Sequence, residues 1–391
     1  MTSELISYVL LLLGIVHTIS WIALLNRLLI GLRNSPTLEN LDPSLKKQSV
    51  TAIIPMRDEE HNVDQCLGSL INQLNVSRLI VVNDHSSDNT IKEVKKHLAN
   101  QKVELIDSPK LRSGWNGKSN ACYAGAINSE TEWLLFVDAD TRIENEMLGR
   151  ALTLAEDQKL DAVSAVGELR CVHLWDKIST PFYFRMLNAF YKMSDVNDLS
   201  KSLGYFYGNF ILIKRESYFK IGGHASIAKE VVEDKEFGSF AKANGLRIGV
   251  ARAHNSLSAE WVPGFRHGIE ALSRVSIPSL KGRLKLGAAL TSALTILFFT
   301  PWLILFSAFF APTHIAMALF AIASLAIIIE LVFTGYSSSL MNVNLVYSLE
   351  FLFPQLVYAY VLWGSVYRLW KGIPISWRGR KYVYNRESYH C

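Results

Sequence analysis

Long apolar runs without charged side chains occupy both ends of the sequence. Leu5–Asn26 contains no Asp, Glu, Lys or Arg, and Leu286–Ile329 continues for 44 residues without one. Leu331–Tyr367 follows and is interrupted only by Glu350. An α-helix rises about 1.5 Å per residue and the hydrocarbon core of a bilayer is about 30 Å thick, so the 44-residue run suffices for two crossings. This pattern predicts an integral membrane protein.

The N-terminal run is expected to be an uncleaved anchor rather than a signal peptide. Glu4 precedes the run, no Lys or Arg does, and the run is longer than a typical signal core. Arg27 and Arg33 follow closely, and the positive-inside rule assigns that end to the cytoplasm. The polar region that comes next is therefore expected on the cytoplasmic face.

The C-terminal apolar region offers three candidate crossings, at Gly287–Phe310, Ile315–Phe333 and Val343–Trp363. Three crossings would place the tail outside the cell. Five cations within 14 residues favour a cytoplasmic tail instead: Arg368, Lys371, Arg378, Arg380 and Lys381. The third candidate is the weakest because Pro354 interrupts it. We expect that it lies in or dips into the interface, or that the aromatic stretch near Phe182–Tyr191 alters the count.

Between the apolar ends, strand and helix patterns alternate. Buried strands are predicted at Val50–Pro55, Arg78–Asp84, Val103–Ser108 and Trp133–Asp140. After Asp140 the pattern loosens, and strands are predicted at Ala162–Leu169 and Phe210–Arg215. Helices are predicted at Asn62–Leu74, Asn89–Asn100 and Gly117–Ser129. The alternation favours an α/β fold with a parallel sheet covered on both faces. Ligands of such sheets bind beyond the carboxyl ends of the strands, where Asp84, Asp138 and Asp140 stand.

Composition supports a membrane protein and argues against a nucleic-acid partner. Apolar residues make up 50% of the chain and charged residues only 19%, which excludes a disordered protein. The net charge of +5 collects beside the apolar segments, where cations hold a cytoplasmic face, and no nucleic-acid-binding motif accompanies it. The four cysteines are scattered without a CxxC pair, which is typical of a reduced compartment without structural zinc.

Two acidic pairs are candidates for chemistry. Asp138 and Asp140 follow an apolar strand with i, i+2 spacing, and hard carboxylate oxygens suit Mg²⁺ or Mn²⁺ held jointly with substrate phosphates. Glu233 and Asp234 precede a helical pattern. The second pair either caps that helix or supplies a general base, and the pattern alone leaves both open.

Asp84 and Lys118 are candidates for nucleotide recognition. Asp84 could itself cap a helix, but Asp88 or Ser87 can equally cap the one that begins near Asn89, which leaves Asp84 to hydrogen-bond a nucleobase or ribose. The segment around Lys118 is not a P-loop, because Arg112 stands where GxxxxGK[ST] needs glycine. Lys118 at a helix N-terminus nevertheless suits a diphosphate, since the amides and the lysine charge act together.

The order of these segments resembles the membrane-bound family 2 glycosyltransferases, which have a GT-A fold. The similar segments are IIPMRDEE, VVNDHSSDNT, FVDADT, GNFILIKRESYFKIGGH and VVED, within residues 50–285. WNGKSNACYAG, GGHASIAKEVVEDKEFGS and ISWRGRKY are closer to the carotenoid-, hopanoid- and ceramide-type lipid glucosyltransferases. Processive synthases carry Q-x-x-R-W, which this sequence lacks, so transfer of a single sugar is favoured over polymerisation. Arg266 and Arg274 are candidates to replace part of that motif.

The resemblance implies roles for individual residues. Asp138 and Asp140 would bind a divalent metal (Mg²⁺ or Mn²⁺), and Asp234 with Glu233 would form the catalytic acidic pair on the acceptor side. Residues expected to contact the nucleotide-sugar donor are Pro55, Arg57, Glu59, Asp84, Lys118, Asp138, Arg378 and Arg380. The donor is expected to be a UDP-sugar, the acceptor a lipid, and the reaction inverting.

The expected organisation is a GT-A domain, Rossmann-like and nucleotide-sugar-binding, flanked by transmembrane helices. An anchor (1–30), a linker (31–49), the catalytic domain (50–285), membrane helices (286–370) and a basic cytoplasmic tail (371–391) follow one another. Alternatives are transfer to a polyprenyl phosphate, a catalytically silent membrane scaffold, and a transporter. The intact carboxylates argue against the scaffold. Glu330 and Glu350, expected near helix ends, offer little for a transport pathway.

Overall fold

The structure is a computed structural model that describes residues 2–43, 48–260, 264–279, 284–377 and 380–382. The chain divides into two compact units. Unit 1 comprises Met1–Ile30, Cys171–Phe190 and Trp261–Cys391, and unit 2 comprises Gly31–Arg170 and Tyr191–Glu260. The chain therefore leaves unit 2 after β7 (Glu168–Arg170), adds one helix to unit 1, and returns.

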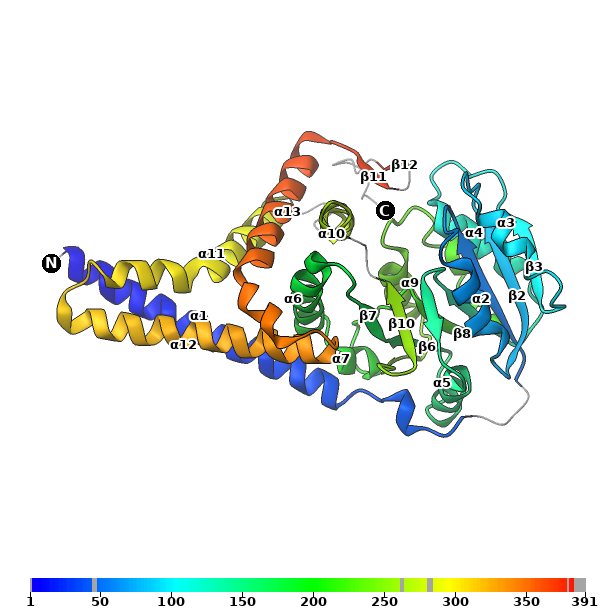
Figure 1. The fold of residues 1–391 in the computed structure, drawn as a ribbon, viewed down its shortest axis with the longest axis horizontal. Coiled ribbons are helices and arrows are strands. Elements are labelled where there is room, and N and C mark those ends of the chain that lie inside the picture. The colour runs from blue at the N-terminus through cyan, green and yellow to red at the C-terminus, as the bar shows by residue number, and fades with distance from the viewer. Residues whose placement is uncertain (1, 44–47, 261–263, 280–283, 378–379, 383–391) are drawn as a thin grey trace. The chain divides into compact units, whose positions relative to one another are not determined.

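Unit 2 is built on a seven-stranded sheet (Figure 1). In spatial order its strands are β3 (Val103–Asp107), β2 (Val76–Asn83), β1 (Val50–Met56), β4 (Trp133–Val137), β8 (Phe210–Lys214), β6 (Ala162–Val166) and β9 (Ile248–Arg252). A smaller sheet has the order β5 (Thr141–Ile143), β10 (Leu257–Glu260) and β7. All six strands predicted from the sequence are present, with bounds shifted by a few residues.

Helices connect and cover these strands. They are α2 (Val63–Ile71), α3 (Thr90–Lys95), α4 (Gly117–Ile127), α5 (Met147–Asp157), α7 (Met193–Asn197), α8 (Arg215–Lys220) and α9 (Glu233–Ala243). The three predicted helices correspond to α2, α3 and α4. Helix α4 packs closely on the sheet at Gly125, where a Cβ atom would lie 2.4 Å from Ile53 Cγ2. A larger residue at 125 would therefore push α4 away from β1.

The parallel sheet predicted from the strands up to Asp140 is confirmed, and the sheet also contains β8, for which the sequence pattern indicated no direction. Strands β3, β2, β1 and β4 are parallel, but β8 runs antiparallel to both β4 and β6. The chain leaves β6 at its carboxyl end and returns at that same end, because Phe210 pairs with Val137 at the end of β4. Two parallel neighbours need a connection that crosses to the opposite end of the sheet. The connection from β6 to β8 does not cross, and the pattern of apolar residues does not reveal this. The reversal brings the start of β8 beside the end of β4.

Unit 1 consists mainly of apolar helices. They are α1 (Thr2–Arg33, its last residues in unit 2), α6 (Leu174–Phe190), α10 (Phe265–Ser279), α11 (Leu284–Ala308), α12 (Thr313–Leu340) and α13 (Leu352–Lys371). Figure 1 shows α11 and α12 side by side. Helix α1 packs against both, since a Cβ at Gly14 would lie 2.9 Å from Ile304 and 3.0 Å from Ile322.

Among the described residues, three helices are long and apolar enough to cross a membrane: Glu4–Arg33, Leu284–Ala308 and Thr313–Leu340. They agree with the predicted N-terminal anchor and the first two C-terminal candidates. The third candidate, Val343–Trp363, is divided between a 3₁₀ helix (Leu345–Glu350) and α13 and does not meet the same measure. Its position in the interface stays a prediction.

A buried polar cluster joins four helices of unit 1. Glu330 lies in the middle of α12, fully buried, so its predicted place near a helix end was wrong. His17 Nε2 lies 3.1 Å from its Oε1, and Gln355 Nε2 donates to its Oε2 at 2.5 Å. Arg185 donates to the Glu330 carbonyl oxygen at 3.3 Å and to the Thr334 hydroxyl. Glu350, by contrast, ends the 3₁₀ helix and is exposed, as expected.

Glu330→Ala is expected to destabilise the protein by about 3–5 kcal/mol, since removing one partner of a buried ionic cluster leaves the others unsatisfied. Thermal unfolding of the detergent-solubilised protein measures this loss. Glu350→Ala is the matched control, because that side chain is exposed. Equal unfolding temperatures for the two variants would contradict a stabilising cluster.

Candidate active site

The Asp138-Ala139-Asp140 segment follows β4 directly, at the carboxyl edge of the sheet. The chain turns here, and the Thr141 amide donates to the Asp138 carbonyl oxygen at 3.1 Å. Ala139 points into the core and is 4% exposed, whereas the two flanking carboxylates are half-buried. The i, i+2 spacing therefore places both acids on the open side of the turn, as the sequence predicted for the end of a buried strand.

Lys118 links the two acidic pairs. Its Nζ lies 2.6 Å from Asp138 Oδ1 and 2.8 Å from Glu233 Oε1. Lys118 stands in the first turn of α4, whose N-cap Asn116 accepts a hydrogen bond from the Ser119 amide at 2.7 Å. Burial alone would lower the pKa of Lys118, but the two carboxylates outweigh it and raise the pKa well above its ordinary value. Lys118 is therefore a fixed cation between the acidic pairs.

Glu233 and Asp234 begin α9, where the helix dipole favours negative charge. Asp234 Oδ2 accepts from the Gly208 amide at 3.1 Å, and Oδ1 accepts from the Lys235 amide at 2.7 Å. These bonds fix the orientation of the carboxylate. Glu233 is buried and faces Lys118, so the two adjacent acids have different partners.

Gly208 approaches Asp234 so closely that a side chain has no room. A Cβ on Gly208 would lie 2.9 Å from Asp234 Oδ2. If Asp234 is catalytic, Gly208→Ala should therefore displace its carboxylate and slow the reaction roughly 10- to 100-fold with little change in unfolding temperature. Steady-state kinetics beside a thermal melt tests this, with Gly68→Ala as control because nothing lies within 4 Å of a Cβ there. Unchanged kinetics in Gly208→Ala would show that the contact does not matter.

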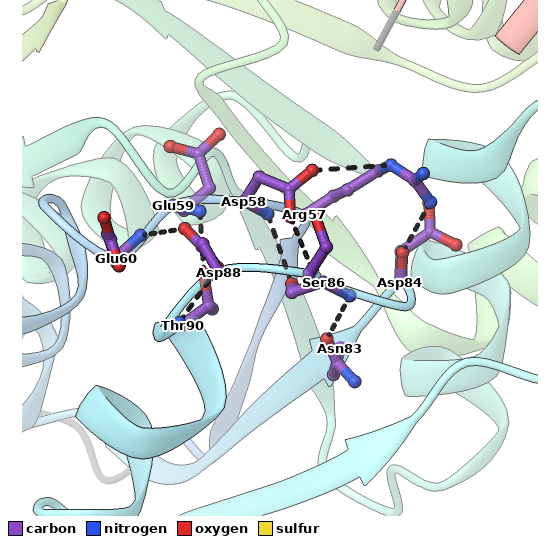
Figure 2. Close-up of polar contacts among 10 residues, drawn as sticks. Arg57, Asp58, Glu59, Glu60, Asn83, Asp84, Ser86, Asp88 and Thr90 are labelled. Carbon is purple, nitrogen blue, oxygen red and sulfur yellow. Dashed lines mark hydrogen bonds and ion pairs between the residues drawn. The ribbon is translucent and has the colours of Figure 1, made fainter. Parts of the chain in front are cut away.

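Two loops beyond β1 and β2 hold one another through reciprocal hydrogen bonds (Figure 2). Arg57 Nη1 donates to the Asp84 carbonyl oxygen at 2.9 Å, and the Glu59 amide donates to Thr90 Oγ1 at 2.8 Å. Carboxylates of Asp58, Glu60 and Asp88 accept amides of the opposite loop. Asp58 and His85 have left-handed backbone conformations, with φ of 54° and 57°. The cross-loop bonds offset this strain and fix Arg57 and Asp84 beside the strand ends.

One pocket in unit 2 brings together four of the expected charged side chains, whereas Arg57, Glu59, Asp84 and Asp140 are not among its lining residues. Its lining includes Pro55, Lys118, Asp138, Gly208, Glu233 and Asp234. Sequence patterns did not single out Gly208 or His224, which also lines the pocket. The two consecutive glycines before His224 were the feature of the sequence that could have indicated a tight turn at this position. Arg378 lies outside the described residues, and Arg380 lies on β12 (Arg380–Tyr382) of unit 1.

The carboxylates fit a divalent metal only if it is shared with another ligand. Within the described part of the chain, no group of three or more His, Cys, Asp or Glu side chains could hold a metal alone. Asp138 and Asp140 offer two hard oxygen donors at an open edge, as Mg²⁺ or Mn²⁺ sites completed by substrate phosphates require. Lys118 Nζ lies 2.6 Å from Asp138 Oδ1, so a metal at this edge would share the Asp138 carboxylate with the lysine.

Comparison with known proteins identifies the domain that contains this pocket. Residues 51–234 match the model of glycosyl transferase family 2. These residues form a family 2 glycosyltransferase domain. The match spans β1 to the start of α9 and so includes the D-x-D turn, Lys118 and the second acidic pair.

Individual relatives agree with this assignment. A 4,4'-diaponeurosporenoate glycosyltransferase of Staphylococcus aureus (strain bovine RF122 / ET3-1) is 28% identical over 207 residues, which is 52% of this chain and 54% of the relative. The same enzyme of strain USA300 is 27% identical over the same shares. The chain thus matches about half the length of these relatives.

A solved structure has a similar fold. The mannosyltransferase PcManGT from Pyrobaculum calidifontis, in complex with GDP-Man and Mn²⁺, has a TM-score of 0.55 at 17% identity, covering 93% of this chain and 99% of that one. That likeness concerns the fold and confirms the GT-A class.

Proposed function

We propose that this protein transfers a single sugar from a nucleotide-sugar to a lipid acceptor at a membrane surface, with inversion at the anomeric carbon. The observation that carries the proposal is the convergence of Asp138, Lys118 and Asp234 on one pocket from β4, α4 and α9. Binding of a diphosphate and removal of an acceptor proton need a cation and a base on opposite sides of the transferred sugar, and this pocket offers both.

On the donor side, the two loops that carry Arg57 and Asp84 would bind the nucleoside. Glu59, which belongs to the first of these loops, would also contact the donor. Lys118 and the amides at the start of α4 would hold the diphosphate. A divalent metal bound by Asp138 and Asp140 would offset charge on the departing nucleoside diphosphate. The related fold of PcManGT holds GDP-Man and Mn²⁺, which supports a metal-assisted donor site.

On the acceptor side, Asp234 would act as general base. The acceptor hydroxyl oxygen attacks the anomeric carbon, its proton passes to Asp234, and the nucleoside diphosphate leaves with the electrons of the broken C–O bond. Glu233 would hold Lys118 rather than touch the acceptor, because it is buried and already pairs with that lysine.

A lipid acceptor is supported by two observations. Three helices of the described chain are apolar enough to cross a membrane, and the Staphylococcus relatives act on 4,4'-diaponeurosporenoate. That name denotes a carboxylate, so both hydroxyl and carboxylate lipids are candidate acceptors. A polyprenyl phosphate remains the alternative acceptor. A carboxylate or phosphate acceptor is already ionised near pH 7, so neither would need a base to remove a proton.

The direct test uses the full chain in lipid nanodiscs, incubated with nucleotide-sugars, Mn²⁺ and a lipid extract. We expect a lipid that gains the mass of one hexose in mass spectra. Asp138→Asn protein, prepared identically, is expected to give no such product. Absence of any sugar-bearing lipid with every nucleotide-sugar tried would reject the proposal and favour a silent scaffold.

The catalytic region and the basic tail are proposed to face the cytoplasm. Cys391 reports on the tail: a membrane-impermeant thiol reagent should label it only after permeabilisation. Cys66 and Cys122 are buried, and burial raises the pKa of the Cys66 thiol to about 12, so both react poorly. Replacing these two and the half-buried Cys171 with serine removes all competing label. Labelling on intact cells would place the tail outside.

A further inference from the structure

His224 lies in a turn that fixes it against Tyr218. Gly222 and Gly223 have φ of 80° and 55°, values that glycine adopts readily. A Cβ on Gly223 would lie 2.3 Å from the Tyr218 ring, so only glycine allows this approach. As a result the His224 amide donates to the Tyr218 hydroxyl at 3.1 Å, and His224 Nδ1 lies 3.0 Å from the same oxygen.

The imidazole is also held between the two acidic motifs. Phe136, two residues before Asp138, meets it edge-on with ring centroids 4.7 Å apart. Phe237, three residues after Asp234, stacks on it at 4.8 Å. His224 as a whole is 2% exposed, yet it lines the same pocket as both acids. The ring therefore occupies one defined position in the wall of the pocket.

The hydrogen bonds of Tyr218 favour one tautomer of His224. The Tyr218 oxygen accepts the His224 amide, and we assign its hydroxyl hydrogen to the 3.0 Å contact with Nδ1, which is the acceptor that lies within reach. Nδ1 is then an acceptor, and Nε2 carries the hydrogen. Within the residues that the structure describes, the hydrogen bonds given for His224 are both with Tyr218 and involve its amide and Nδ1. The pocket wall thus contains an oriented N–H donor.

This donor is uncharged at working pH. Burial lowers the pKa of His224 to about 3, although the carboxylate of Glu233 acts in the opposite direction and Lys118 adds to the lowering. The imidazole of His224 is therefore expected to stay neutral near pH 7. Its available chemistry is hydrogen-bond donation to a neutral or anionic oxygen.

We propose that His224 donates its Nε2 hydrogen to an oxygen of the transferred sugar and so helps to select that sugar. The inference rests on the proposed function: if Asp138 and Lys118 hold the diphosphate and Asp234 faces the acceptor, the sugar ring must lie between them. His224 lines the pocket there. A site that hydrogen-bonds a substrate hydroxyl discriminates strongly against analogues that lack it.

Two substitutions separate donation from packing. His224→Phe keeps an aromatic ring between Phe136 and Phe237 but removes the donor, and His224→Gln restores an N–H at similar reach. The binding of nucleotide-sugars and of the bare nucleoside diphosphate is measured by calorimetry, without acceptor. For the best-bound sugar, His224→Phe should weaken nucleotide-sugar binding roughly 10- to 100-fold and leave nucleoside diphosphate binding unchanged. His224→Gln should recover part of the loss.

Donor analogues complete the test. The same binding measurement is repeated with a series of nucleotide-sugars that each lack one sugar hydroxyl. The analogue that lacks the hydroxyl bonded by His224 should bind wild type and His224→Phe with equal affinity. His97→Phe is the control, because His97 pairs with Asp64 and does not line the pocket. Equal weakening for every donor and for the bare diphosphate would reduce His224 to a packing residue and overturn the inference. Wild-type protein that binds no nucleotide-sugar would instead reject the proposed function.

Discussion

Replacing Asp138 with asparagine is expected to slow sugar transfer about 1000-fold while the protein folds and expresses as before. The substitution removes one charged oxygen ligand from a metal that would stabilise the leaving diphosphate, an effect worth several kcal/mol. A loss of about 4 kcal/mol corresponds to roughly 1000-fold in rate. Lys118 stays paired with Glu233 at 2.8 Å in the variant, so no buried cation is left alone.

Asp140→Asn should behave in the same way, because the two carboxylates flank one turn at the end of β4. The rates are measured with saturating donor at several Mn²⁺ concentrations, and unfolding temperatures are recorded in parallel. Asp157→Asn, on the exposed end of α5, is the control. Full activity of both Asn variants in the presence of a chelator would show that neither acid serves a metal.

The strand ends were predictable from the sequence because buried parallel strands have a simple signature. The run WLLFV before Asp138 is fully buried, and β4 ends where the carboxylates begin. Period and apolarity report how far a strand extends and which of its ends carries polar groups. They do not report strand direction, which is why the reversal of β8 and the position of Gly208 beside Asp234 were not predicted.

The contacts within the site depend on segments far apart in the chain. Lys118 and Glu233 are separated by more than one hundred residues, and their ion pair follows from the packing of α4 and α9 on the same sheet edge. The sequence indicated both groups but assigned Lys118 only to the diphosphate. Its second role, as the counter-ion of Glu233, could be seen only once the fold brought them together.

Glu330 shows the same limit in the apolar helices. An acid in an otherwise uncharged run suggests a helix end when the partners are unknown. Its actual partners come from three other helices: His17 of α1, the Arg185 region of α6 and Gln355 of α13. No local pattern connects these positions, so the cluster had no signature in the sequence.

Asp234→Asn is the substitution that distinguishes the classes of acceptor. Asparagine keeps an oxygen to accept the Gly208 amide, which Asp234 Oδ2 accepts at 3.1 Å, so the local structure should persist. If the acceptor is a hydroxyl, loss of the base should lower the rate by about 100-fold or more. A carboxylate lipid, with a pKa of about 4, or a phosphate lipid is ionised near pH 7 and has no proton to lose. With such an acceptor the variant should retain near-normal turnover.

The measurement compares wild type and Asp234→Asn on matched lipids that differ only in a terminal hydroxyl or carboxylate. Glu236→Gln, two residues further along α9, is the control for changes in charge at the helix start. A large loss on the hydroxyl lipid alone would identify Asp234 as the base. Equal turnover of both proteins on both lipids would assign Asp234 a structural role at the start of α9, where it accepts hydrogen bonds from the amides of Gly208 and Lys235.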